Sequence, residues 1–186
     1  LIVTAGPWAR ELLAELKLPL TVLRKTLFWW ETDGSSYRAD RACPTFLFDT
    51  PGGCFYGFPQ LDARGVKMAE HTGGLPLADP GNVSREIDPA EQGRVAEFAR
   101  QFLPKLSQRC TAHAVCMYTM TPDAHFIVDR HPNHAELVFA AGLSGHGFKF
   151  ASMLGEALVE LACGGQTSLP FGFLSASRLR AGGLNP

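Results

Sequence analysis

Two short stretches of the chain carry residue types from which an active site can be built. The first, Val115–Asp123, contains the Cys116 thiol and the Tyr118 phenol. The second, Ser144–Lys149, reads Ser-Gly-His-Gly-Phe-Lys and places two glycines close to the cation of Lys149. A thiol, a phenol, a glycine-lined turn and a cation on neighbouring elements can bind and act on a small polar molecule. The pattern therefore indicates a site, and not only a core.

The glycine-rich turn Gly142–Lys149 follows a predicted strand and opens a predicted helix. Glycines let a backbone approach a ligand closely, and a helix start presents unpaired N–H groups. Such a turn suits an anion, or a flavin carbonyl whose negative charge grows on reduction. A plain strand-to-helix turn with positive φ explains the same glycines. The dinucleotide fingerprint G-x-G-x-x-G occurs nowhere in the chain.

Each reactive group in these stretches also has an ordinary structural explanation. Cys116 and Tyr118 alternate on a predicted strand and so share one face, but most such cysteines are packing residues. A cation at Lys149 opposes the helix dipole, which indicates a compensating anion. A solvated lysine whose stem covers apolar surface is the alternative. Cys116 acting as a hydrolase nucleophile, with His125 or His146 as base, lacks an orienting third group.

A second candidate group lies earlier, on a predicted strand covering residues 66–71. Lys67 and His71 are four residues apart and therefore share a face of this strand, and Tyr56 falls near them through the predicted hairpin. Of the six histidines, His131 and His134 flank Pro-Asn in a predicted turn. No tight ligand spacing occurs among them, and we expect no metal site.

The elements needed to position these residues follow from periodicity and turn residues. We expect strands over residues 1–5, 20–30, 46–49, 54–58, 66–71, 112–119, 126–129 and 137–141, with helices over 7–16, 89–103 and 147–162. Thr50-Pro51-Gly52-Gly53 predicts a hairpin turn, and Asp88 caps the helix that Pro89 begins. The first and last strands are expected in one sheet and the middle strands in another, which predicts an α+β fold.

Composition narrows the class of protein. The 186 residues are 46% hydrophobic and 19% charged, with a net charge of −1, as expected for a folded globular protein. No basic excess favours nucleic acid, and no apolar run is long enough for a membrane span. Five widely spaced cysteines without a C-x-x-C pair are expected to be reduced thiols, without disulfides, in a cytoplasmic protein.

These signals coincide with a known pattern. The chain resembles the carboxyl-terminal half of the monomeric sarcosine oxidase and N-methyltryptophan oxidase family. The matching pieces are Thr4–Trp8, Tyr56–Pro59, Gly65–Lys67, His71, Cys116–Asp123, His125–Asp129, His131–Pro132 and Gly145–Phe150. The resemblance implies a FAD-dependent oxidase that uses oxygen to oxidise a small N-methyl amino acid to formaldehyde, the parent amino acid and hydrogen peroxide.

The resemblance also implies roles for individual residues. Cys116 falls on the position that links FAD covalently, and Lys67 on the lysine that activates oxygen. His71 and Tyr56 match residues that shape the amine pocket. Tyr118, Gly145 and Lys149 fall on substrate contacts, Lys149 on the ligand of the substrate carboxylate. The other positions implied to border the flavin are Gly6, Trp8, Ser144, His146, Gly147 and Phe148.

The same resemblance implies the domain organisation. Residues 1–17 match a remnant of a Rossmann-like FAD domain, residues 18–112 a substrate domain with a largely antiparallel mixed sheet, and residues 113–186 the return to the FAD domain. The family's nucleotide-binding fingerprint is absent, and Leu1-Ile2-Val3 reads as a chain cut inside a domain. By itself the chain is therefore expected to be colourless, inactive and prone to form a homodimer through exposed sheet edges. The alternative is a non-catalytic ligand- or protein-binding domain.

Overall fold

Residues 1–179 are described by a computed structural model, and they divide into two units. The middle unit comprises residues 24–75 and 81–116. The terminal unit comprises residues 1–23, 76–80 and the chain from residue 117 onward. Strands β2 (Thr21–Thr32), β6 (Leu75–Leu77) and β7 (Leu106–Met120) contribute residues to both units.

A six-stranded sheet forms the basis of the middle unit. Its order is β3-β4-β5-β2-β6, with β7 paired to β2. The bounds of the remaining strands are Phe46–Thr50 for β3, Gly53–Phe58 for β4 and Val66–Glu70 for β5. The pairs β3–β4, β4–β5 and β2–β5 are antiparallel, and β3 and β4 form the predicted hairpin. In register, Tyr56 pairs with Ala69, and Lys67 pairs with both Phe58 and Trp29.

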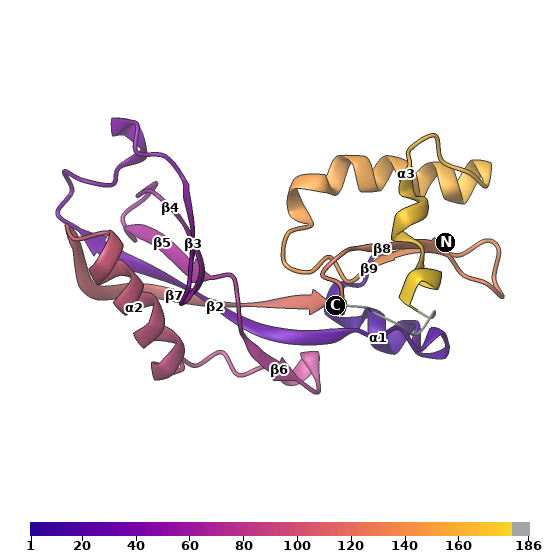
Figure 1. Ribbon diagram of the computed structural model, residues 1–186, viewed down its shortest axis with the longest axis horizontal. Helices are drawn as coiled ribbons and strands as arrows, with labels where there is room; N and C mark the ends of the chain where they lie inside the picture. The colour runs from indigo at the N-terminus through magenta and orange to yellow at the C-terminus, as the bar shows by residue number, and fades with distance from the viewer. Residues whose placement is uncertain (180–186) are drawn as a thin grey trace. The chain divides into compact units, whose positions relative to one another are not determined.

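Helix α2 (Pro89–Phe102) covers this sheet (Figure 1). The helix begins as predicted, with Pro89 in its first turn. The Asp88 carboxylate accepts a hydrogen bond from the backbone N–H of Ala90 at 2.7 Å. The apolar stripe of α2 packs with the inner face of the strands into one core, which includes Phe28, Trp30, Phe55, Val66, Met68, Val95, Phe98 and Ala99. The ring of Phe98 stacks on that of Phe55, with centroids 4.5 Å apart.

The terminal unit is built on a three-stranded sheet in the order β1-β9-β8. Strand β1 (Ile2–Val3) pairs in parallel with β9 (Val138–Ala141), and β8 (Ile127–Arg130) pairs antiparallel with β9. The predicted pairing of the first and last strands is thus confirmed. Helix α3 (Ala151–Gly164) lies along the sheet in Figure 1, and Leu154 and Leu158 pack on Val128, Val138 and Ala140. The mixed sheets and helices confirm the α+β class.

The predicted continuous helix over residues 7–16 is wrong. A 3₁₀ turn (Gly6–Trp8), a single α-helical turn α1 (Ala9–Leu12) and a second 3₁₀ turn (Ala14–Leu16) take its place. The break falls at Leu13, whose backbone leaves the helical region at φ −114° and ψ 33°. The physical reason is packing, since Ala9, Leu13 and Leu16 are buried in the same core cluster as the segment that follows, Leu18 and Leu20.

Some elements extend beyond their predicted ranges. Strand β7 covers fifteen residues, more than the predicted 112–119. The final helix begins with a 3₁₀ turn (Phe148–Phe150) before α3. Further 3₁₀ turns cover Ala39–Arg41, Pro80–Asn82, Phe171–Leu174 and Ala176–Leu179. None of the helices within residues 1–179 combines the length and the apolar character needed to cross a lipid bilayer.

Candidate active site

The middle unit brings Tyr56 and His71 together. Their ring centroids lie 6.3 Å apart at 77°, an edge-to-face arrangement. The backbone N–H of His71 donates to the carbonyl of Cys54 at 2.7 Å, which fixes the end of β5 against β4. The Lys25 ammonium then donates to the carbonyls of His71, Thr72 and Gly73 at 3.1, 2.6 and 3.1 Å. The segment that follows β5 is therefore held from both sides.

Lys67 lies between two aromatic rings of the same sheet. Its Nζ is 5.4 Å from the ring centroids of both Trp29 and Phe58, within the range of a cation–π contact. Arg64 lies over the same Trp29 ring at 4.6 Å. Lys67 and these neighbours line an open hollow of about 250 Å³. Asp62 also lines this hollow and pairs with Arg64 at 2.6 Å. The Lys67 ammonium beside the apolar walls is suited to a small molecule that gains negative charge.

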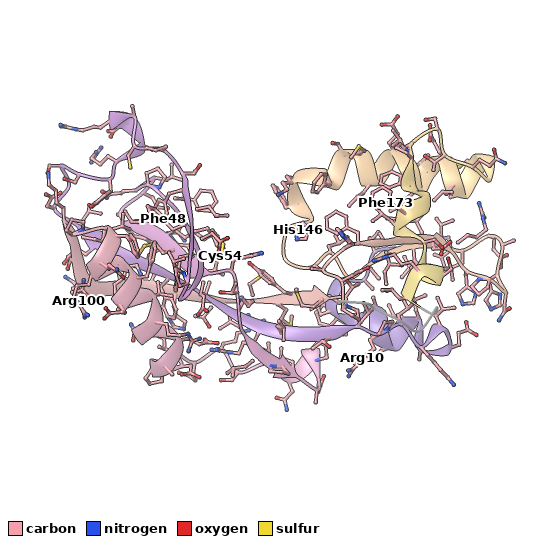
Figure 2. All side chains as sticks on the ribbon, in the orientation of Figure 1. Arg10, Phe48, Cys54, Arg100, His146 and Phe173 are labelled. Atoms are coloured by element: carbon pink, nitrogen blue, oxygen red, sulfur yellow. The ribbon has the colours of Figure 1, made fainter. Side chains whose placement is uncertain are left out.

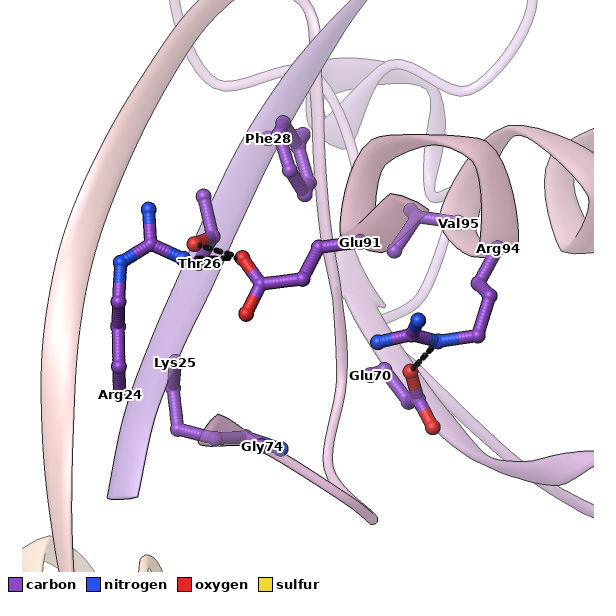
Figure 3. Close-up of a pocket in the computed structure, with 9 residues that line it drawn as sticks. All are labelled: Arg24, Lys25, Thr26, Phe28, Glu70, Gly74, Glu91, Arg94 and Val95. Carbon is purple, nitrogen blue, oxygen red and sulfur yellow. Dashed lines mark hydrogen bonds and ion pairs between the residues drawn. The ribbon is translucent and has the colours of Figure 1, made fainter. Parts of the chain in front are cut away.

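A cluster of charged residues, which the sequence analysis missed, lies between strands β2 and β5 and helix α2. Glu91 reaches from α2 to β2, where its carboxylate accepts hydrogen bonds from Arg24 Nη1 and Thr26 Oγ1, each at 2.5 Å (Figure 3). Beside it, Arg94 Nε donates to the Glu70 carboxylate at 2.7 Å. Burial lowers the pKa of Lys25, the third cation of this cluster. The available signal was the run Arg24-Lys25-Thr26, three polar residues between the apolar stretches 22–23 and 27–30.

In the terminal unit, the predicted residues Tyr118 and Gly145 are in contact. Gly145 has φ +79°, and a Cβ added there would lie 2.3 Å from Cε2 of Tyr118. Only glycine permits this approach without displacing the ring. The phenol of Tyr118, on β7, is thereby placed directly against the glycine-rich turn.

Ser144 holds the same turn to β7. Its backbone N–H donates to the Thr119 carbonyl at 2.9 Å, and its hydroxyl donates to the Gly142 carbonyl at 3.0 Å. The hydroxyl also accepts from the amide of Thr121 at 3.3 Å. Ser144 itself adopts φ +48°, a conformation that an L-residue takes only where its surroundings enforce it. The turn is therefore preorganised.

Two later residues of this turn, His146 and Lys149, border a second hollow. His146 packs against Phe126 with ring centroids 4.9 Å apart, and its Nδ1 lies 3.0 Å from the Ser144 carbonyl. Figure 2 shows His146 and Phe173 in this unit. Both border a mostly apolar hollow of about 220 Å³, which Lys149 also lines. Phe148 projects outward and is 97% exposed. Gly147 packs closely on the side chain of Leu143. A Cβ added at Gly147 would lie 2.6 Å from Cδ1 of Leu143.

The other predicted flavin contacts are exposed or unobstructed in the structure. Cys116 on β7 is exposed, as a thiol that forms a covalent link must be. Gly6 has φ +53° with no atom within 4 Å of an added Cβ, and Trp8 is 44% exposed. Tyr56, Lys67, His71 and Cys116 belong to the middle unit, whereas Tyr118, Gly145 and Lys149 belong to the terminal unit. Convergence of Cys116, Lys67 and Lys149 on one concavity stays a prediction.

A family model described as FAD dependent oxidoreductase matches residues 1–161. The chain belongs to this FAD-dependent oxidoreductase family. It is 40% identical over 182 residues to a monomeric sarcosine oxidase of Bacillus sp. (strain B-0618), covering 96% of this chain and 46% of that protein. It is 38% identical over 163 residues to an N-methyl-L-tryptophan oxidase of Shigella dysenteriae serotype 1, covering 87% of this chain and 42% of that protein.

The fold of this FAD-dependent oxidoreductase chain agrees with solved structures. An L-proline dehydrogenase from P. horikoshii aligns with a TM-score of 0.76 at 20% identity, covering 96% of this chain and 46% of the dehydrogenase. This likeness shows the fold alone. In each comparison, the chain spans about half the length of the relative that it matches.

Proposed function

We propose that the full-length protein oxidises the N-methyl group of an amino acid of the sarcosine or N-methyltryptophan type. In this reaction the secondary amine, oxygen and water give the primary amine, formaldehyde and hydrogen peroxide. The substrate is a small molecule. The observation that carries the proposal is the match to oxidases of these two substrates at 38–40% identity over 163–182 residues. The geometry of the two units supports it residue by residue.

Residues of both units have the chemistry to hold FAD. Cys116 offers an exposed thiol for a covalent link. The turn Ser144–Phe148 brings glycine backbone to a helix start, although the N–H groups of Ser144 and His146 already donate within the protein. Gly6 and Trp8 present open backbone and an accessible indole. FAD held by these residues would supply the redox chemistry, which transfers two electrons from the amine to oxygen. On this proposal residues 1–17 and 113–186 belong to the FAD domain and residues 18–112 to the substrate domain.

Lys149, Tyr118 and Gly145 would bind the amino-acid substrate. The Lys149 ammonium is suited to its carboxylate, and the apolar hollow beside it can receive the rest of the molecule. The ring of Tyr118 lies against the bare backbone of Gly145, so its phenol lies beside the glycine-rich turn. Nearby cations lower the pKa of the substrate amine, which must be neutral to release a hydride. Tyr56 and His71 would shape the space around this amine.

Lys67 would act in the oxygen half-reaction. Negative charge develops on oxygen as the first electron arrives, and a fixed cation stabilises that charge. The Trp29 and Phe58 rings on either side keep the Lys67 ammonium in a partly dehydrated setting. The proposal also places the protein in the cytoplasm, which fits five cysteines that form no disulfide within the described residues. A homodimer through exposed strand edges is a further part of it.

The covalent link gives the sharpest test. The full-length protein is precipitated with acid, and the pellet is examined for flavin absorbance. We expect yellow pellets from the natural sequence and colourless ones from Cys116→Ser. The matched control is Cys163→Ser, which removes another exposed thiol, in helix α3. Flavin that stays with Cys116→Ser contradicts the assignment of Cys116. A full-length protein that forms no peroxide from sarcosine or N-methyltryptophan contradicts the proposed activity.

A further inference from the structure

We propose that Glu15, His131 and His134 form a binding site for a divalent metal ion of the zinc class. Glu15 lies on the 3₁₀ turn Ala14–Leu16, and the two histidines lie in the loop that joins β8 to β9. One ligand atom from each residue lies within 4.8 Å of the other two. All three residues belong to the terminal unit. The proposal is independent of the function proposed above.

The separations of the ligand atoms suit a single small ion. Glu15 Oε1 lies 2.9 Å from His131 Nε2 and 3.9 Å from His134 Nε2. Two ligand atoms that each lie about 2.0–2.1 Å from one tetrahedral zinc ion are about 3.3 Å apart. The observed distances fall on either side of this value. The third separation, between His131 and His134, is bounded by the 4.8 Å within which all three ligand atoms lie. Rotation of the exposed Glu15 and His134 side chains would complete the geometry.

His131 provides a second, independent reason to infer a ligand. Its side chain is 1% exposed, and its Nε2 has no hydrogen-bond partner within the described residues. Glu15 Oε1 is near this nitrogen but is not in line for a hydrogen bond. A buried polar atom without a partner costs about 1–3 kcal/mol. An ion between the two groups would satisfy both of them.

The loop that carries the histidines is already ordered by its own hydrogen bonds. The amide of His131 donates to the Leu137 carbonyl at 2.8 Å, and the amide of Leu137 donates to the His134 carbonyl at 2.9 Å. The guanidinium of Arg130 also donates to the carbonyl of Ala135. Because these contacts fix the backbone, little ordering of the loop opposes binding of an ion.

One existing bond must be given up when an ion binds. The amide of Asn133 donates to His131 Nδ1 at 3.2 Å, so the proton of the neutral ring resides on Nε2. Coordination through Nε2 moves this proton to Nδ1 and displaces the amide. The lost bond is worth about 1 kcal/mol, whereas structural zinc sites in small domains contribute about 10–16 kcal/mol. The exchange therefore favours the ion.

The ligand types at this site determine which metal ions it favours. Two imidazoles and one carboxylate favour zinc, copper or nickel over magnesium and calcium, which prefer oxygen ligands. Glu15 and His134 have side chains 58% and 52% exposed, so an ion can enter from solvent. Three protein ligands leave one position of a tetrahedral ion for water. The ion would connect the turn at residues 14–16 to the β8–β9 loop.

The test is titration calorimetry of the 186-residue chain with Zn²⁺. Its five cysteines are first alkylated with iodoacetamide, because exposed thiols also bind zinc. We expect one ion per chain. Glu15→Gln and His134→Gln should each raise Kd more than about tenfold, whereas Glu11→Gln and His113→Gln, on exposed side chains elsewhere, should leave it unchanged. Absence of binding, or equal binding by all four variants, overturns the proposal.

Thermal unfolding provides a second readout. An ion that binds only the folded chain stabilises it by RT ln(1 + c/Kd), where c is the concentration of the free ion, so Tm rises with that concentration. Zn²⁺ should therefore raise the Tm of the natural sequence and of Glu11→Gln but not that of Glu15→Gln. An equal rise in all three proteins would place the ion elsewhere and overturn the assignment.

Discussion

A methyl group at Gly145 would lie 2.3 Å from Cε2 of Tyr118, so the phenol ring occupies the space that a side chain at position 145 requires. Gly145→Ala should therefore displace the Tyr118 ring as well as strain the backbone. The positive φ costs about 1–2 kcal/mol and the overpacking about 1–3 kcal/mol. Urea unfolding measures the total loss in the free energy of unfolding. A change in the near-ultraviolet circular dichroism spectrum would show that the Tyr118 ring has moved.

A second glycine gives the matched control for this prediction. Gly155 lies inside helix α3, and an added Cβ there meets nothing within 4 Å. Gly155→Ala should stabilise the chain by about 0.5–1 kcal/mol, because alanine has the better helix propensity. Equal effects of the two substitutions would show that Tyr118 does not depend on the bare backbone of Gly145.

Asp123 and Arg178 form a two-pronged ion pair in the terminal unit. Arg178 Nε donates to Asp123 Oδ2 at 2.7 Å, and Nη2 donates to Oδ1 at 3.1 Å. The guanidinium holds the pKa of Asp123 far below its ordinary value of 3.8. Asp123→Asn should lower the free energy of unfolding at neutral pH by about 1–3 kcal/mol.

The pH dependence of this effect has a definite sign. A carboxyl group whose pKa is depressed by folding stabilises the protein fully above its unfolded pKa, and this contribution is lost as the pH falls further. The difference between the natural sequence and Asp123→Asn should therefore be constant from pH 7 to about 5 and shrink below the ordinary pKa of 3.8. A difference that grows on acidification would contradict the ion pair. Asp40→Asn, in an exposed pair with Arg38, is the control and should change little.

The middle unit depends on the buried contact between Glu91 and Arg24. Glu91→Ala would leave the Arg24 guanidinium buried without its carboxylate partner, and such a loss costs about 3–5 kcal/mol. Glu97→Ala on the same helix α2 removes an exposed carboxylate that pairs with Arg100, and it should have little effect. Urea unfolding measures the loss of stability in each of the two variants. Similar midpoints would show that Arg24 finds another partner, such as water.

The sequence was sufficient to predict the elements that have strong local signals. The Asp88-Pro89 start of α2, the Pro-Gly-Gly hairpin and the β1–β9 pairing all appear in the structure. The break at Leu13 was not predictable, because apolar spacing is the same in a continuous helix and in separate turns that bury the same leucines. Local patterns carry no information on which distant side chains meet, and so the Arg24–Glu91 pair was missed.

The same limit applies to the candidate sites. The predicted hairpin placed Tyr56 near His71, and their rings are in edge-to-face contact. His131 and His134 alone gave no reason to expect a metal, because their third partner, Glu15, is more than a hundred residues earlier in the chain. The positive φ of Ser144 has no sequence signal, since serine rarely adopts it.

Lys67 provides the test that separates the two halves of the proposed reaction. In the full-length protein, Lys67→Met should slow reoxidation of the flavin by oxygen far more than it slows reduction by the amine. The reason is that a cation stabilises the charge developing on oxygen, whereas methionine keeps the size and apolar stem of the lysine. Stopped-flow absorbance measures each half-reaction separately.

Arg64→Met is the matched control, since Arg64 lies on the same Trp29 ring but pairs with Asp62, and it should leave both rates nearly unchanged. Equal slowing of both half-reactions by Lys67→Met would exclude a role for Lys67 in oxygen activation.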